Sequence, residues 1–121
     1  MKVRAARGAI DVQADDAELV LDATGRLLSA LMDRNGIERD DLISILFTVT
    51  DDLRSVFPAE AARRMGLGLV PLMCAREIPV AGAMSGVIRI LIHFHSDRGL
   101  EDVVHVYLDG AGSLRDDLDQ R

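Results

Sequence analysis

The chain has 121 residues and a mass of 13.2 kDa, which is enough for one domain. Hydrophobic residues make up 49% and charged residues 28% of the sequence, a balance that excludes an intrinsically disordered chain. The net charge of −6 argues against a general nucleic-acid binder, and without a long apolar segment or a leader-like N-terminus we expect a cytoplasmic protein that does not enter a membrane.

The first half of the chain predicts a strand, a long helix and a second strand. Residues 2–10 are apolar and punctuated by arginine, which predicts an opening strand. In residues 16–34, leucine and alanine recur at steps of three and four before Asn35 and Gly36, so we expect a long helix there. Residues 42–50 are β-branched and almost continuously apolar, and they predict a strand that is buried on both faces.

The next segment predicts a short helix and a strand. Pro58 stands where the first turn of a helix tolerates proline, and the glycines at 66 and 68 would end that helix after about two turns. Residues 69–74 predict a further strand, and Pro79–Gly86 predict a loop.

The last third of the chain predicts two strands and a tail. Residues 87–95 alternate between an apolar face (Ile88, Ile90, Ile92, Phe94) and a mixed face (Val87, Arg89, Leu91, His93, His95). Residues 103–108 predict the final strand, and we expect residues from about 109 to 121 to form a flexible tail. Together these elements predict a single α+β domain, residues 1–121, with a mixed five-stranded sheet, one long helix and one short helix. Because the strands carry more apolar surface than one long helix can cover, we also expect an oligomer.

Arg89 is the first candidate functional residue. It lies in mid-strand on the mixed face, where an ionised arginine must be paired or must bind an anion. The spacing favours a salt bridge to Glu77, or an exposed strand face, over a ligand site. Arg7 beside Gly8 has the same two interpretations, since the glycine allows a close backbone approach.

The histidines and the cysteine offer weaker signals. His93 and His95 point the same way from one strand, but no third zinc ligand stands out beyond His105, so solvated or cross-strand histidines are favoured. Cys74 has no partner for an intramolecular disulfide and no neighbouring histidine, so we expect an inert thiol. Tyr107 is the only tyrosine and needs a polar partner if it is buried.

Five motifs in order along almost the whole chain nevertheless resemble one family. They are VRAARGA with Arg7, FTVTDDLRSVFPAEAARRMG, VPLMCAREIPV with Cys74 and Glu77, VIRILI with Arg89, and HVYLDGAGSLRDDL with Tyr107 and Arg115. This set is similar to the monofunctional chorismate mutases of the Bacillus type, the aroH class. The resemblance implies a homotrimer, a pseudo-α/β-barrel, with active sites between neighbouring subunits. It also implies rearrangement of chorismate to prephenate on the way to phenylalanine and tyrosine, with no cofactor and no metal.

The resemblance assigns roles to ten residues. It implies that Arg89 donates to the ether oxygen whose bond breaks and that Glu77 accepts from the ring hydroxyl, while Arg7 and Tyr107 bind the enolpyruvyl carboxylate. The remaining six would bind substrate: Phe57 and Ala59 as walls, Arg63 as positive charge at the mouth, Cys74 through its backbone, and Leu114 and Arg115 in a closing tail. A pericyclic rearrangement needs no nucleophile, and it is accelerated by holding the folded substrate and by placing positive charge where electron density develops.

The sequence departs from the family pattern at two positions, and two other functions compete with the mutase. Glu60 stands where members often carry a lysine near the ring carboxylate, and Asp116 replaces the proline after the tail arginine. The competing functions are a non-catalytic trimer that binds small carboxylates in the same clefts, and another enzyme on a similar scaffold, such as an imine or enamine deaminase. The joint presence of Arg7, Glu77, Arg89 and Tyr107 favours the mutase, because a carboxylate binder does not need the glutamate.

Overall fold

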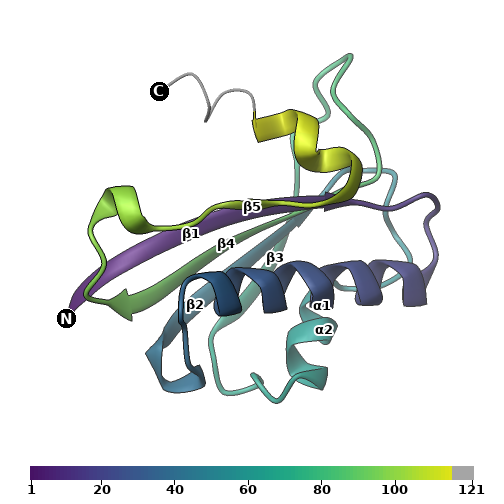
Figure 1. The fold of residues 1–121 in the computed structure, drawn as a ribbon. Coiled ribbons are helices and arrows are strands. Elements are labelled where there is room, and N and C mark those ends of the chain that lie inside the picture. Colours follow the sequence, from purple (N-terminus) through teal and green to yellow (C-terminus); the bar gives the residue numbers. More distant parts are fainter. Residues whose placement is uncertain (116–121) are drawn as a thin grey trace.

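The structure, a computed structural model, describes residues 1–115. These residues form one mixed five-stranded sheet in the order β3-β2-β4-β1-β5, with helices α1 and α2 on the same side of it (Figure 1). The strands are β1 (Lys2–Asp11), β2 (Leu42–Val49), β3 (Leu72–Arg76), β4 (Val87–Ser96) and β5 (Val106–Tyr107). The helices are α1 (Ala17–Arg34) and α2 (Ala59–Arg64), with 3₁₀ helices η1 (Arg39–Asp41), η2 (Leu100–Asp102) and η3 (Asp109–Arg115). The predicted α+β class and mixed sheet are confirmed.

The register of the sheet brings residues from all five strands into one row. Strand β4 is antiparallel to both β1 and β2, whereas the edge strands β3 and β5 run parallel to β2 and β1. The row consists of Ala75, Thr48, Arg89, Ala9 and Tyr107, each paired with the next. Because directly paired residues share a face of a sheet, these side chains all lie on one face.

The opposite face of the sheet carries the hydrophobic core. The Asp16 carboxylate accepts from the Leu19 N–H at 3.0 Å and so begins α1, whose leucines pack on the sheet. The largest side chains with no exposure come from the sheet and the helix: Phe47, Phe94, Ile10, Ile88, Ile92, Leu27, Leu28 and Leu31. This arrangement follows from the predicted alternation of β4 and the three-and-four spacing of α1.

The face without helices, called the open face below, is only partly buried within one chain. On β2, Ile45 and Phe47 are buried in the core, whereas Leu46 and Thr48 on the open face are half-buried. The expectation that this strand is buried on both faces is therefore wrong for the single chain. An uninterrupted apolar run does not distinguish a strand that is covered by its own chain from one that still has an uncovered face.

Helix η3 covers one end of the open face (Figure 1). Ala111 is fully buried there against Ala9 and Val87. The start of η3 is tied down twice: Asp109 pairs with Arg26 of α1 at 3.1 Å, and the Gly110 N–H donates to the Asp11 carboxylate at 2.7 Å. The predicted tail thus begins with an anchored helix, and its flexibility stays a prediction. Residues 116–121, with Asp116, lie outside the described part.

The last strand is shorter than predicted, because side chains take the place of ladder hydrogen bonds. The amide of Asn35 accepts from the Val104 N–H and donates to the Val104 carbonyl, both at 2.8 Å. The Arg7 N–H donates to Nδ1 of His105 at 3.1 Å instead of to a carbonyl. Only Val106 and Tyr107 remain to pair with β1, so the predicted strand over 103–108 is corrected to these two residues.

Strand β3 also differs from its prediction. It spans Leu72–Arg76 and not residues 69–74, because the backbone turns first, with the Val70 N–H on the Leu67 carbonyl at 3.0 Å. Pairing with β2 starts only when the Pro71 carbonyl accepts from the Ile45 N–H at 3.0 Å. Proline has no N–H for the ladder, which favours its place just before a strand. Across residues 1–115, no helix has both the length and the apolar character that crossing a membrane requires.

Candidate active site

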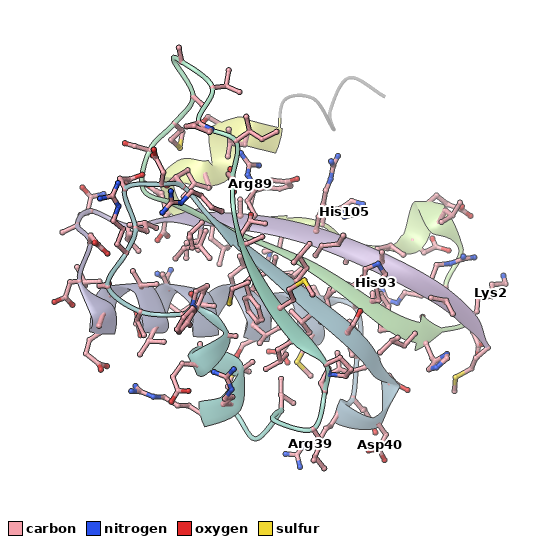
Figure 2. The ribbon with its side chains drawn as sticks, turned by 180° about the vertical axis from the view of Figure 1, so that it is seen from behind. Lys2, Arg39, Asp40, Arg89, His93 and His105 are labelled. Carbon is pink, nitrogen blue, oxygen red and sulfur yellow. The ribbon has the colours of Figure 1, made fainter. Side chains whose placement is uncertain are left out.

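A cavity of about 310 Å³ lies on the open face around Arg89. Its lining includes Arg7, Thr48, Arg89, Tyr107 and Leu114. Arg89 lies beside η3, which supplies Leu114 (Figure 2). Four of the ten residues predicted for the site are therefore brought together, from β1, β4, β5 and η3, although they are spread over more than one hundred positions of the sequence.

Glu77 joins this cavity through Arg89. The Arg89 Nε donates to Glu77 Oε2 at 3.0 Å, which is the salt bridge that the spacing offered as one of two alternatives to a ligand site. The Glu77 side chain is 17% exposed, and that of Arg89 is 42% exposed, so the guanidinium can still present its other N–H groups to a ligand. Backbone geometry holds Glu77 in place, because its N–H donates to the Val49 carbonyl at 2.9 Å directly after β3 ends.

Gly8 allows Arg7 and Tyr107 to lie on adjacent strands. A Cβ atom at this position would lie 2.5 Å from the Val106 carbonyl oxygen and 2.9 Å from a methyl group of Leu27. Any larger residue would therefore push β5 or α1 away from β1. Tyr107 pairs with Ala9, and Arg7 is two residues before Ala9 on the same face, so both polar groups point to the open face.

A second cavity, of about 660 Å³, contains two other predicted residues. It lies between the end of β2, the loop that leads to α2, and β3, and its lining includes Phe57 and Cys74. Phe57 is 72% exposed, which is unusual for an aromatic side chain within a single folded chain. Cys74 is paired with Phe47 of β2 and therefore points to the helical side of the sheet, away from the Arg89 cavity.

The remaining three predicted residues lie in neither cavity. Ala59 is 2% exposed and packs in the main core, so its side chain is no wall of an open pocket in this chain. Arg63 is exposed on α2 and pairs with Glu60 at 3.4 Å, three residues earlier. Arg115 ends η3, and its side chain lies outside the described part of the structure. Their substrate-binding roles stay predictions.

The loop between Glu77 and Arg89 is clamped at its C-terminal end. The Gly86 N–H donates to the Asp52 carboxylate at 3.0 Å, and Thr50 Oγ1 accepts from the Val87 N–H at 3.0 Å. A hydrogen bond from the Thr50 side chain, followed by the one from Gly86, holds the pKa of Asp52 below its usual value of 3.8. Gly86 has a φ of +69°, and a Cβ there would lie 2.8 Å from the Val12 carbonyl oxygen, so glycine is required.

Thr48 is a site residue that the sequence patterns did not indicate. Its hydroxyl donates to Glu77 Oε2 at 2.8 Å, so that this oxygen accepts from both Thr48 and Arg89. The available signal was a hydroxyl in the middle of the apolar run 42–50, which a strand buried on both faces would have to satisfy.

The histidines behave as the favoured interpretation expected. His93 Nδ1 lies 3.2 Å from the Ser44 hydroxyl across β2 and β4, and His95 is exposed. In residues 1–115, no three His, Cys, Asp or Glu side chains lie close enough to hold a metal ion.

The chemical capability of the site follows from these groups. Arg7, Arg89 and Tyr107 line a concave surface and offer donors for a carboxylate and for an oxygen that gains electron density. The Glu77 carboxylate beside Arg89 can accept from a hydroxyl group. An arrangement of this kind binds and orients a small, polar anion, and it stabilises charge that develops within that anion.

Comparisons with known proteins agree on one family. The family model described as chorismate mutase type I matches residues 3–118. A chorismate mutase AroH of Thermus thermophilus is 48% identical over 118 residues, which cover 97% of each chain. A protein of the same name from Bacillus subtilis (strain 168) is 35% identical over 119 residues, or 98% of this chain and 94% of that protein. The solved structure of a chorismate mutase from Clostridium thermocellum has a TM-score of 0.90 at 44% identity, covering 91% of this chain and 98% of the other.

Proposed function

This chain belongs to the type I chorismate mutase family, and on that basis we propose how its residues convert chorismate to prephenate. The activity is that of an intramolecular transferase in aromatic amino acid biosynthesis. We propose that the substrate, a dianion, binds in the cavity around Arg89, with its enolpyruvyl group folded over the ring. The observation that carries this proposal is the convergence of Arg7, Arg89 and Tyr107 on one cavity, with Glu77 fixed beside Arg89.

Arg89 stabilises the developing charge in this proposal. In a Claisen rearrangement the carbon–oxygen bond breaks ahead of carbon–carbon bond formation, so the ether oxygen gains electron density. The guanidinium of Arg89 uses Nε on Glu77, which leaves its terminal N–H groups for the ether oxygen and the side-chain carboxylate. Since these donors are held in place before the reaction begins, they favour the transition state over the ground state.

Glu77, Arg7 and Tyr107 orient the substrate. Glu77 accepts from the ring hydroxyl, and its negative charge stabilises the positive charge that develops on the ring. Arg7 and Tyr107 bind the enolpyruvyl carboxylate from β1 and β5. Holding both ends of a flexible molecule removes much of the entropic cost of reaching the folded conformation.

We propose that the complete site forms between chains of a homotrimer. Two features support this: the site residues are divided between the Arg89 cavity and the Phe57 cavity, and the surface near them is unusually apolar. The exposed fractions are 72% for Phe57, 67% for Met73, 84% for Ile78 and 63% for Val80. Large apolar side chains that are exposed to this degree near a site are typical of an interface. In the trimer, the Phe57 cavity of one chain, with Cys74 and Arg63, completes the Arg89 cavity of its neighbour.

The test is the conversion of chorismate by purified protein, followed by ultraviolet absorbance and by acid conversion of prephenate to phenylpyruvate. The matched variant is Arg89→Leu, which removes the charge from the same strand position. We expect kcat to fall by at least about 10²–10³, the loss typical for one preorganised donor. A fall of less than tenfold would remove Arg89 from the central role. A folded trimer of the unchanged chain without turnover would support a non-catalytic carboxylate binder instead.

A further inference from the structure

The geometry points to Thr48 as a positioning residue that keeps one oxygen of Glu77 available for the substrate. This inference rests on the proposed function, because it concerns how Glu77 and Arg89 are arranged before the substrate arrives. Thr48 does not belong to the ten residues that the family resemblance assigns to the site, and it acts through Glu77.

Thr48, Arg89 and Glu77 lie on three neighbouring strands or directly after one of them. Thr48 of β2 pairs directly with Arg89 of β4, and also with Ala75 of β3, two residues before Glu77. All these side chains share the open face, so Glu77 reaches back over the row and meets Thr48 and Arg89 together. The strand pairing therefore determines that this hydroxyl and this guanidinium meet the same carboxylate.

Both donors use the same carboxylate oxygen. Thr48 Oγ1 and Arg89 Nε lie 2.8 Å and 3.0 Å from Glu77 Oε2. Among the hydrogen bonds of residues 1–115, Oε1 of Glu77 accepts none. With two donors on Oε2, the orientation of the carboxylate is determined, and Oε1 stays available to a hydroxyl group of the substrate.

The competing arrangement shows what Thr48 prevents. Arginine and a carboxylate prefer a bidentate pair, in which two N–H groups meet both oxygens. Such a pair would occupy Oε1 of Glu77 and one terminal N–H of Arg89, the two groups that the reaction needs. Thr48 opposes this rotation by holding Oε2. Because threonine is β-branched and its χ1 angle is restricted, the direction of the hydroxyl is well defined.

The test compares two substitutions of Thr48 that differ in the hydroxyl. Thr48→Val keeps the shape and the β-branching but has no donor, whereas Thr48→Ser keeps the donor. We expect Thr48→Val to lower kcat/KM by about tenfold to a hundredfold, the effect of losing a hydrogen bond to a charged group, and Thr48→Ser to stay within about threefold of the unchanged protein. Ser44→Ala removes another hydroxyl from the same face of β2, outside the Arg89 cavity, and should leave kcat/KM within about twofold.

The decisive measurement is a double-mutant cycle with Glu77→Ala. If Thr48 acts through Glu77, then Thr48→Val lowers kcat/KM by less than about twofold once Glu77 is absent. Equal losses in the two backgrounds, an unchanged kcat/KM in Thr48→Val, or a Thr48→Ser variant as impaired as Thr48→Val would each overturn the inference. Should valine disturb the strand, Thr48→Ala replaces it in the same cycle. If Glu77→Ala and Arg89→Leu themselves leave activity unchanged, the proposed function fails, which is a different result from a failure at Thr48 alone.

Discussion

At the scale of single residues, the contact between Arg89 and Glu77 matters for chemistry more than for stability. The Arg89 side chain is 42% exposed and that of Glu77 is 17% exposed, and solvent around the guanidinium screens the pair, so it contributes about 1 kcal/mol to folding. Arg89 therefore forms a salt bridge with Glu77 and can bind an anion at the same time. The salt bridge that the spacing favoured exists, and it leaves part of the guanidinium facing a cavity. We expect Arg89→Leu to stay folded while it loses activity, which a thermal unfolding curve of the variant checks.

Glu60 is a residue where the family pattern and this chain disagree. It forms ion pairs with Arg63 at 3.4 Å and with Arg64 at 3.8 Å within α2, and Arg64 also pairs with Glu18 of α1 at 3.5 Å. Glu60→Lys would add a positive charge and remove the acidic partner of Arg63, so that both cations can attract the ring carboxylate of the substrate. We expect KM to fall and kcat to change less, as for uniform binding to a remote part of the substrate. The measurement is steady-state kinetics, and a large change in kcat at constant KM would contradict this role.

At the scale of elements, β5 depends on side chains for its position. It has only two residues, and next to it His105 accepts the Arg7 N–H at 3.1 Å, which requires a lone pair on Nδ1. We expect His105→Ala to raise KM about fivefold to tenfold, because one hydrogen bond of about 1 kcal/mol no longer holds Arg7 and Tyr107 together.

His105→Asn provides the matched control for this prediction. An asparagine oxygen can stand near the position of Nδ1 and accept the same N–H, so KM should return most of the way to that of the unchanged protein. If the asparagine variant is as impaired as the alanine variant, then His105 does not act by accepting the Arg7 N–H.

The clamp between Asp52 and the loop before β4 predicts a pH dependence of stability. The pKa of Asp52 lies below 3.8 in the folded protein, owing to the Thr50 and Gly86 hydrogen bonds. A lowered folded pKa stabilises the protein above the unfolded pKa, and this contribution is lost as the pH falls through the folded value. Asp52→Asn should therefore lower the free energy of unfolding by about 1 kcal/mol or less at pH 7, and by less at a pH well below 3.8. Urea unfolding at both pH values measures this, and an equal difference at the two would refute the assignment.

At the scale of the whole molecule, the separation of two cavities in one chain predicts that two inactive variants restore activity when they assemble together. Arg89→Leu damages one cavity, and Phe57→Asp places a negative charge in the other. If the active site lies between chains, random co-assembly of the two inactive variants restores about a quarter of the unchanged activity, because one site in four then combines two intact halves.

A matched mixture shows whether this restoration depends on the two cavities. Arg89→Leu with Arg7→Ala damages the same cavity in every chain, so no activity should return. Restoration in both mixtures, or in neither although trimers form, would contradict a site shared between chains. Sedimentation equilibrium of each mixture measures the trimer itself.

The sequence by itself determined the helix α1, the alternation of β4, the α+β class and the motifs around Arg7, Glu77, Arg89 and Tyr107, because periodicity and motif spacing are local properties of a chain. Only the tertiary structure decided how these residues meet. Thr48 and Glu77 are 29 positions apart, and Arg7 and His105 are 98 apart, so both contacts depend on the strand order β3-β2-β4-β1-β5. The same long-range pairing shortened β5 and divided the site residues between two cavities, since a residue's neighbours across a sheet follow from strand order and register, which no local pattern contains.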